Sequence, residues 1–375
     1  MKFKSGTFVN TELGFRAFRP ELLNGSYRFD EAELLPLLEQ ANLKLGELNG
    51  YAEIVPDVDH FIFLHVIKEA TVSSKIEGTQ TKMEEALLHA EEVEPEKRDD
   101  WQEVNNYISA MNESIEGLSD LPLSSRLLRQ AHRILLTGVR GEHKLPGEFR
   151  SSQNWIGGSS PKNASFVPPI WQDVNPLMGD LENFLHNENT GLPHLIKIAL
   201  AHYQFETIHP FLDGNGRIGR LLITLYFIHA GVMRKPLLYL SDFFDRNRSD
   251  YYEHLMSVRT RSDLKSWLRF FLLGTLETSN KAIAGLKRII ELKKDCETKR
   301  IPQLGKKMNT ALVLLLRLFN QPLIRPAEVA DITGQSLVSS YALIEDFVRL
   351  NILREITGGQ RNRIYIFQEY FRVFE

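Results

Sequence analysis

The sequence contains a single cysteine among its 375 residues, and this scarcity excludes an intramolecular disulfide. A large chain with one thiol, Cys296, suits a reducing compartment, so we expect a cytoplasmic protein. The sequence also lacks a long apolar run. The longest, around 221–228, is far shorter than the roughly 20 residues that span a bilayer, so we expect no membrane segment and no membrane partner.

The chain has no excess of positive charge. Lys and Arg number 45 against 48 Asp and Glu, which gives a formal net charge of -3. Because nucleic-acid binding depends largely on basic side chains that neutralise phosphates, any such binding would have to be local. The composition, 43% hydrophobic and 25% charged, is typical of a globular protein, and the length allows two or three domains.

Helical periodicity dominates the chain after an N-terminal arm, 1–30, that shows no sustained period and predicts irregular structure. Apolar residues recur at helical spacing in a series of segments. We expect helices over 34–48, 59–77, 101–119, 124–137, 171–188, 193–207, 217–230, 248–261 and 267–294. One stretch interrupts them, SQNWIGGSSPKNASFVPP at 152–169, whose apolar ends flank a turn-rich centre and predict a β-hairpin. The fold class is therefore mainly α.

The end of the chain has a different order of elements. A charged segment with a proline and a glycine, 293–307, predicts a boundary. Beyond it, helical patterns at 310–319, 325–333 and 336–350 precede two strand-like pieces, ILREI and RIYIF. Three helices followed by a two-stranded wing are the order of a winged helix-turn-helix domain, with Gly334 at the tight turn.

The densest chemical pattern is HPFLDGNGRIGR at 209–220. A glycine-rich loop before a helix leaves backbone amides unpaired, and together with the helix dipole they favour a phosphate. Arg217 and Arg220 lie three residues apart at the start of that helix and can reach the same anion. Asp213 supplies a hard oxygen ligand that suits Mg²⁺, and His209 suits a general base near neutral pH.

By spacing alone, this stretch is equally compatible with an ordinary turn and a capping histidine. Every defined position, however, resembles the signature of the Fic family, His-Pro-Phe-x-(Asp/Glu)-Gly-Asn-Gly-Arg-x-x-Arg, and the resemblance covers most of 30–285. It implies transfer of AMP from ATP, with Mg²⁺, to a Ser, Thr or Tyr hydroxyl of target proteins or of the enzyme itself. In this comparison His209 is the base and Asp213 the Mg²⁺ ligand. The residues implied to bind the nucleotide are Gly214, Asn215, Gly216, Arg217, Ile218, Gly219 and Arg220.

Two more segments resemble parts of the family's site. The hairpin at 152–169 is similar to a flap that holds a target by strand addition, with Ile156 and Gly157 near the nucleotide. A plain connection between helices is the alternative. The segment DYYEHL, 250–255, resembles the one beside the adenine and makes Tyr252 a candidate there, although a lone tyrosine on a helix can equally belong to the core.

The segment SSKIEG at 73–78 resembles the family's inhibitory motif, (Ser/Thr)-x-x-x-Glu-(Gly/Asn). Taken alone, Gly78 would be a helix cap and Glu77 a surface acid. If Glu77 instead pairs with Arg220, that arginine cannot hold the terminal phosphate, and ATP binds with its α-phosphate misaligned for attack. The resemblance therefore implies an autoinhibited protein adenylyltransferase whose inhibitory residues are Ser73 and Glu77.

We expect three consecutive domains: a helical region with the inhibitory helix (1–105), a Fic-type helical core with a β-hairpin flap (106–295) and the winged helix (300–375). Two other functions stay open. One is removal of AMP from modified protein, with Glu77 positioning a water, and the other is a nucleotide-responsive DNA-binding regulator.

The winged-helix sequence bears on the second alternative. Its segment SLVSSYALIEDFVRL carries no basic residue before Arg349, and only Arg361 and Arg363 in the wing suit phosphate contacts. We therefore favour a protein contact or a homodimer over DNA binding for this domain.

Overall fold

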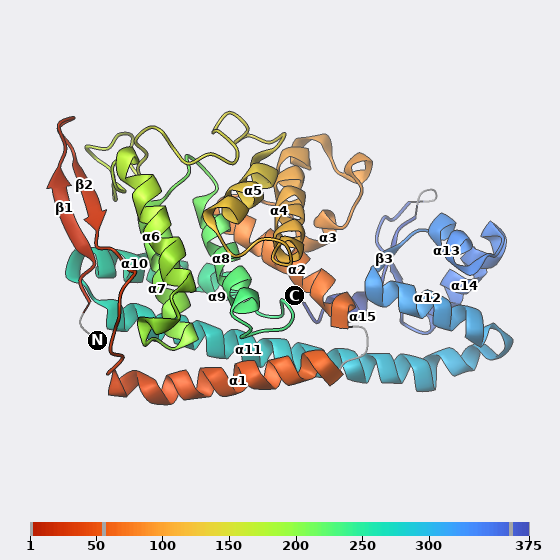
Figure 1. Cartoon of the computed structure of the whole chain (residues 1–375). Coiled ribbons are helices and arrows are strands. Elements are labelled where there is room, and N and C mark those ends of the chain that lie inside the picture. Colours follow the sequence, from red (N-terminus) through yellow and green to blue (C-terminus); the bar gives the residue numbers. More distant parts are fainter. Residues whose placement is uncertain (1–2, 55–57, 360–362, 375) are drawn as a thin grey trace. The chain divides into compact units, whose positions relative to one another are not determined.

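The computed structural model describes residues 3–54, 58–359 and 363–374 (Figure 1). They form two compact units, each built from separate pieces of chain. Unit 1 contains Met1–Asn49 and Glu69–Ser279, and unit 2 contains Gly50–Lys68 and Asn280–Glu375. The three consecutive domains expected from the sequence stay a prediction. Within the described ranges, every helix is too short or too polar to span a bilayer.

Unit 1 begins with a β-hairpin, where the sequence predicts an irregular arm. Strand β1 (Gly6–Asn10) pairs antiparallel with β2 (Arg16–Pro20), drawn as the red arrows in Figure 1. The prediction was wrong because each strand has only five residues, too few for a periodic signal. The amide of Phe18 also donates to the carbonyl of Val167 at 2.9 Å, which ties the hairpin to the 152–169 segment.

The remaining regular elements of unit 1 are helical, in agreement with the mainly α prediction. The α-helices that lie wholly or partly in this unit are α1 (Leu35–Ile54), α2 (Val58–Ile76), α3 (Met83–Ala86), α4 (Arg98–Gly117), α5 (Ser125–Leu136), α6 (Val174–His186), α7 (His194–Ile208), α8 (Asn215–His229), α9 (Ser241–Arg246), α10 (Arg248–Arg261) and α11 (Leu264–Asp295). Most begin and end within a few residues of the predicted bounds.

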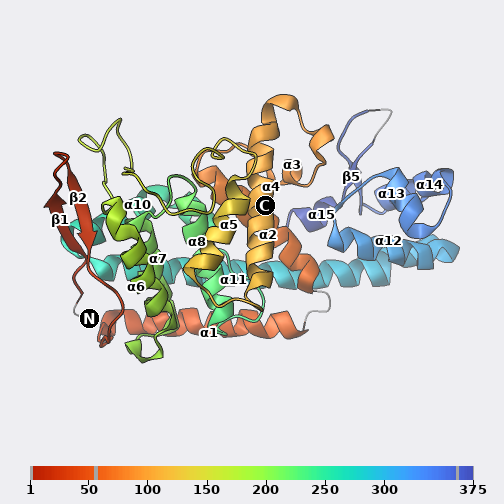
Figure 2. The ribbon, with the colours of Figure 1, turned by 45° about the horizontal axis from the view of Figure 1, so that its top comes forward.

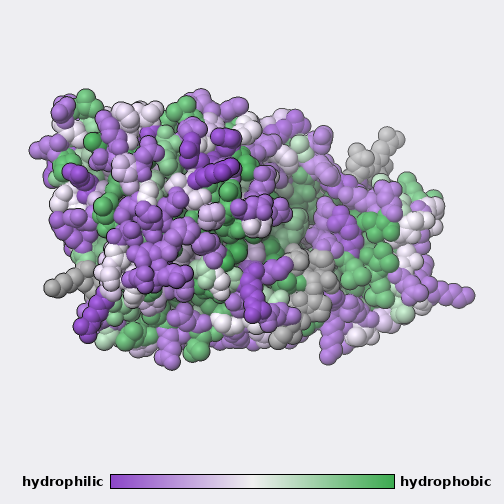
Figure 3. Space-filling model, viewed as in Figure 1, coloured by the Kyte–Doolittle hydropathy of each residue, from purple (hydrophilic) through white to green (hydrophobic). Residues whose placement is uncertain are grey.

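Helix α7 is the core of unit 1. Every residue from Leu195 to Ile208 is buried, because α7 packs against both α6 and α8. Figures 1 and 2 both show α6 and α7 side by side. A helix that is covered all round needs no polar face, which explains its largely apolar sequence. Hydrophilic side chains cover much of the face of unit 1 seen in Figure 3.

The segment predicted as a hairpin at 152–169 is small. It forms one antiparallel bridge, between Ile156 and Phe166, and no longer ladder among its described residues. Gly157 and Gly158 both have a φ of 69°, and a Cβ on Gly158 would collide with the carbonyl of Asn163. The turn therefore depends on glycine at these two positions.

The C-terminal part of unit 2 contains three helices, a small sheet and a final helical turn. These elements are α12 (Met308–Asn320), β3 (Leu323–Ile324), α13 (Pro326–Thr333), α14 (Leu337–Arg349), β4 (Arg354–Glu355), β5 (Tyr365–Ile366) and α15 (Gln368–Phe371). The antiparallel sheet has the order β3-β5-β4, and Gly334 ends α13 with a φ of 66°. The winged-helix assignment stays a prediction, and Arg361 lies outside the described residues.

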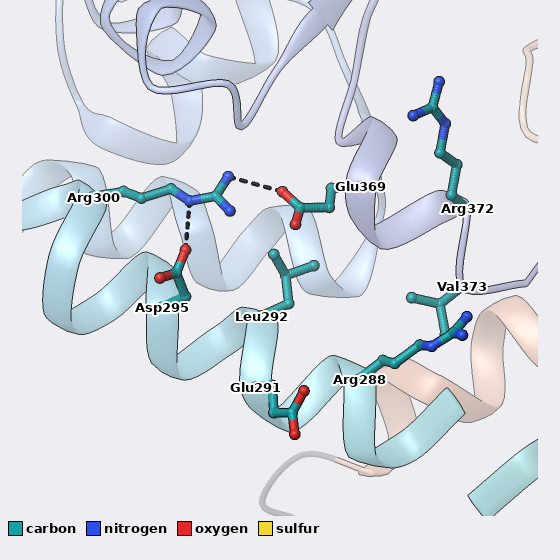
Figure 4. A pocket seen from close by; sticks show the side chains of 8 residues that line it. All are labelled: Arg288, Glu291, Leu292, Asp295, Arg300, Glu369, Arg372 and Val373. Carbon is teal, nitrogen blue, oxygen red and sulfur yellow. Dashed lines mark hydrogen bonds and ion pairs between the residues drawn. The ribbon is translucent and has the colours of Figure 1, made fainter. Parts of the chain in front are cut away.

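The charged segment at 293–307, where the sequence predicts a boundary, is helical. Helix α11 continues into a wider π-type turn, Cys296–Arg300, and then a 3-10 helix, Ile301–Lys307. Arg300 pairs with Asp295 at 2.7 Å and with Glu369 of α15 at 2.9 Å, as Figure 4 shows. Burial raises the pKa of the Cys296 thiol to about 12, so this lone cysteine is unreactive in the folded chain.

Candidate active site

The loop between α7 and α8 begins with a strained residue. His209 adopts a left-handed conformation, φ 52° and ψ 59°, which is uncommon for a residue with a side chain. Asn215 fixes the other end of the loop. Its side chain accepts from the amide of Phe211 at 2.8 Å and donates to the carbonyl of Phe211 at 2.9 Å. Asn215 therefore holds the loop closed rather than presenting its side chain to a ligand.

The side chain of His132, on α5, packs against this loop. Its ring stacks on that of Phe211, with the centroids 3.8 Å apart. The amide of Gly147 donates to Nδ1 at 2.9 Å, so Nε2 carries the proton and donates to the carbonyl of Asp213 at 3.0 Å. Burial lowers the pKa of His132 to about 4 and keeps the ring neutral. A single histidine 81 residues before Asp213 carries no sequence signal of this role.

Helix α8 starts at Asn215, two residues earlier than predicted, because Gly214 adopts a left-handed conformation and ends the loop. The first amides of a helix lack intrahelical partners and favour an anion. At Gly216, a Cβ would collide with Oε1 of Glu77, so a carboxylate already lies against this first turn. Ile218 points elsewhere, since its side chain is fully buried in the core.

Arg220 brings the two sequence motifs together. Its Nη2 donates to Oε1 of Glu77 at 2.7 Å and to the carbonyl of Ser73 at 2.9 Å, and its Nε donates to Oγ of Ser73 at 2.7 Å. Burial alone would raise the pKa of Glu77, but the adjacent guanidinium more than offsets this and holds it below its usual range. The carboxylate is therefore ionised at neutral pH.

Arg217 forms an ion pair with a different acidic residue, Glu103. Its Nη1 donates to Oε2 of Glu103, on α4, at 3.2 Å, and both side chains are buried. Arg140 binds the other oxygen of Glu103 at 2.8 Å. The two motif arginines thus have separate carboxylate partners here, whereas the sequence suggests that both reach one anion. Glu103 was not among the predicted site residues, since an isolated acid on a helix indicates nothing by itself.

The ring of His209 is held neutral. Burial, followed by the charges of Arg259 and Arg150, lowers the pKa of His209 to about 3, so the imidazole is unprotonated at neutral pH, which is the form that a general base requires. Its Nδ1 has no hydrogen-bond partner among the described residues. An unpaired buried nitrogen is compatible with a group that contacts a substrate.

One turn before His209, Glu206 contributes a second unpaired polar group. Its Oε1 is buried without a partner among the described residues, and burial raises the pKa of Glu206 to about 7. A Cβ on Gly219 would collide with this oxygen. The glycine at position 219 is therefore required by the packing of α7 against α8, whatever its relation to a nucleotide.

Asp213 lies at the open edge of the loop. Its side chain is 46% exposed, and Oδ1 accepts from the amide of Gly214 at 2.6 Å. No cluster of three or more metal-binding side chains exists in the part of the chain that the structure describes. Mg²⁺ is commonly bound by one or two carboxylates together with waters and substrate phosphates, so a single accessible carboxylate beside an anion site fits this ion.

The outer candidates lie on α10 and in the 152–169 segment. Tyr252 on α10 is partly exposed, and burial followed by the charge of Glu77 raises the pKa of its hydroxyl. Ile156 carries the bridge of the flap, and Gly157 follows it. Asn154 connects the flap to the loop, because its Nδ2 donates to the carbonyls of His209 at 3.1 Å and Phe211 at 2.9 Å.

Two family models match the sequence of this chain. The model described as Fic/DOC family N-terminal covers residues 35–116, and the one described as Fic/DOC family covers residues 122–227. The chain belongs to the Fic/DOC family. The first match contains the SSKIEG segment and the second contains the HPFLDGNGRIGR segment, so both motifs lie within family sequence.

Relatives and solved structures agree with this assignment. The chain is 37% identical over 125 residues to the protein adenylyltransferase Fic of Aedes aegypti, which covers 33% of this chain and 22% of that protein. It is 36% identical over 133 residues to the enzyme of the same name from Drosophila grimshawi, and this match covers 35% of this chain and 25% of that protein. The match thus spans about a quarter of the length of these relatives.

Solved structures share the fold at low sequence identity. A Fic family protein from Desulfovibrio desulfuricans G20 superimposes with a TM-score of 0.57 at 19% identity, covering 92% of this chain and 98% of that one. Fic-1 (residues 134–508) from C. elegans superimposes with a TM-score of 0.53 at 22% identity, covering 68% of this chain and 73% of that one.

Proposed function

We propose that this Fic/DOC protein transfers AMP from ATP to a Ser, Thr or Tyr hydroxyl of a protein, the chain itself included. One observation carries the proposal: the carboxylate of Glu77 lies against the first turn of α8 and binds Arg220, where an anion is favoured. An anion site that is already formed, and is filled by an acid of the same chain, suits a restrained nucleotide-binding enzyme. The names of the curated relatives support the same activity.

The described groups can supply each part of the reaction. Neutral His209 accepts the proton of the target hydroxyl, whose oxygen forms a bond to the α-phosphorus of ATP. The bond from that phosphorus to the bridging oxygen breaks, and pyrophosphate leaves. The amides at the start of α8 and the freed Arg220 stabilise the charge on the phosphates. Asp213 would hold Mg²⁺, which neutralises phosphate charge when bound.

The restraint follows from the ion pair. As long as Glu77 binds Arg220, the arginine cannot reach a terminal phosphate, so ATP is misplaced for attack. Charge-assisted pairs contribute roughly 1.5–3 kcal/mol, and removal of the acid is therefore expected to raise transfer about tenfold to a hundredfold.

The test is mass spectrometry of Glu77→Gly incubated with ATP, Mg²⁺ and a cell lysate, compared with the parent chain. We expect AMP on target proteins and on the chain itself, with the gain lost in Glu77→Gly/Arg220→Ala. Lys75→Ala is a matched control, because Lys75 is on the same helical turn but pairs with Asp245 at 2.8 Å. Equal labelling by parent and Glu77→Gly at saturating ATP would refute the restraint, and absence of AMP from every variant would refute the activity.

The reverse reaction is a second candidate, because ionised Glu77 lies against the first turn of α8, beside the proposed phosphate site, and can position a water for hydrolysis of the AMP bond. In that case Glu77→Gly loses AMP removal from a modified protein. A cytoplasmic location belongs to the same proposal and rests on the single cysteine.

A further inference from the structure

Arg150 is a buried arginine whose partners are backbone carbonyls. It is 2% exposed, and the hydrogen bonds of its side chain to described residues go to backbone carbonyls. Its guanidinium donates to four carbonyl oxygens: those of His209 (from Nε, 3.0 Å), Ser152 (Nη1, 3.2 Å), Pro169 (Nη2, 2.6 Å) and Ile208 (Nη2, 3.3 Å). Its own amide donates to the carbonyl of Pro210 at 2.8 Å.

The four carbonyls that accept from Arg150 belong to two different parts of unit 1. Ser152 and Pro169 are the two ends of the flap, whereas Ile208 and His209 are on either side of the point where α7 ends in a left-handed residue. One planar group therefore joins both ends of the flap to the backbone that carries the imidazole. A strained residue keeps its conformation only when its surroundings over-determine it, and these hydrogen bonds contribute to that.

Only an arginine fits this arrangement. The guanidinium presents five donors in a rigid fork, whereas lysine has one flexible ammonium that cannot reach four carbonyls in different directions. Burial lowers the pKa of Arg150 to about 10, which still leaves it charged at neutral pH. Because a buried unpaired charge is costly, the four carbonyls serve as its partners.

We infer that Arg150 is a positioning residue that sets the imidazole of His209 against the flap, and so aligns the target hydroxyl with the base. The inference rests on the proposed function. The phosphate contacts proposed above come from α8, Arg220 and Asp213, none of which donates to or accepts from Arg150. Loss of the guanidinium group of Arg150 should therefore lower the rate of AMP transfer and leave the affinity for ATP nearly unchanged.

The experiment compares Arg150→Lys and Arg150→Gln in the Glu77→Gly background. Arg129→Lys is the matched control, because Arg129 also donates to a backbone carbonyl, that of Gly147 at 2.7 Å, but contacts neither the flap nor the end of α7. We expect kcat for AMP transfer to fall roughly tenfold to a hundredfold in both Arg150 variants, as for other small misplacements of reacting groups. The Kd of ATP, measured by calorimetry with His209→Ala added, should change by less than about twofold.

A second measurement does not depend on activity. Hydrogen exchange of the Ile156 and Phe166 amides, which form the flap bridge, should accelerate in Arg150→Lys and Arg150→Gln but not in Arg129→Lys. Parental kcat in Arg150→Lys, or unchanged exchange at the flap, would overturn the inference. An equal loss of ATP affinity and kcat would do so as well, since it indicates a general structural role. If the Glu77→Gly parent itself transfers no AMP, the proposed function fails, and the exchange measurement alone decides the role of Arg150.

Discussion

Three carboxyl groups lie within electrostatic reach of the buried guanidinium of Arg220, and they differ in charge. Glu77 is ionised and pairs with it directly. Glu69 and Glu206 have pKa values raised to about 7 by burial, so each is largely protonated under mildly acidic conditions. Under these conditions Arg220 depends on Glu77 alone for its charge balance. A phosphate can replace that acid without leaving the arginine unpaired, which is the physical basis of a reversible restraint.

Replacement of His209 tests the base. His209→Ala in the Glu77→Gly background should abolish AMP transfer and leave ATP binding largely intact, because the imidazole acts on the incoming hydroxyl and not on the nucleotide. Labelling with isotopic ATP measures the first quantity and calorimetry the second. Transfer at the rate of the Glu77→Gly parent would remove His209 from the role of base.

Replacement of Glu206 tests whether this buried carboxyl group is protonated in the folded protein. Folding raises the pKa of this carboxyl from 4.5 to about 7, so the native state binds the proton more tightly than the unfolded state does. Its contribution to stability is complete below about pH 4.5 and is lost as the pH rises through 7. Glu206→Gln stays neutral, and should exceed the parent in free energy of unfolding by up to about 3 kcal/mol at pH 8 while matching it near pH 4.5.

Urea unfolding of parent and Glu206→Gln at a series of pH values measures this difference. Glu69 stays in both proteins, so its similar titration cancels in the comparison. Parallel curves from pH 4.5 to 8 would contradict a buried, protonated Glu206.

At the scale of elements, the sequence predicts what is periodic or densely patterned. The helices and the loop at 209–220 are long or distinctive enough to be found, and the flap is indicated by its glycines. The hairpin β1–β2 is not, because five-residue strands are too short to show alternation. Arg150 and Glu103 are also missed, since each is an isolated charge whose role exists only once the chain brings distant carbonyls or arginines to it.

The missed hairpin has a testable role in holding the flap. Phe18 of β2 is fully buried, and its ring lies 6.0 Å from that of Phe166, which in turn faces the guanidinium of Arg259 at 3.9 Å. Phe18→Ala leaves a cavity and should lower the free energy of unfolding by about 3–5 kcal/mol. It should also accelerate hydrogen exchange of the Phe166 amide more than that of α7.

Thr7→Ala is the control for this experiment, because Thr7 lies on the exposed side of β1 and should change neither quantity appreciably. A Phe18→Ala protein that loses stability without faster exchange at the flap would show that the hairpin contributes to the core but does not hold the flap.

At the scale of the whole molecule, the remaining question is what unit 2 contributes to a Fic/DOC protein. Helix α14 is the helix that a winged-helix domain would present to DNA. Its first two residues are apolar and exposed, Leu337 at 51% and Val338 at 80%, and its one basic residue is Arg349 in the last turn. Asp346 pairs with Arg349 at 2.7 Å and with Lys307 at 2.6 Å. Such a surface suits a protein partner better than phosphates.

We therefore predict that the full chain binds duplex DNA only non-specifically, with a Kd on the order of 10⁻⁴–10⁻⁶ M at physiological salt. Fluorescence anisotropy with a pool of random duplexes, repeated at two salt concentrations with and without ATP, measures this. Arg363→Ala, in the predicted wing, should change the result little, because one phosphate contact alters the salt dependence by only about one unit. Nanomolar binding that ATP shifts would contradict the prediction and favour a nucleotide-responsive regulator. It would also require basic side chains other than those of α14 to supply the phosphate contacts.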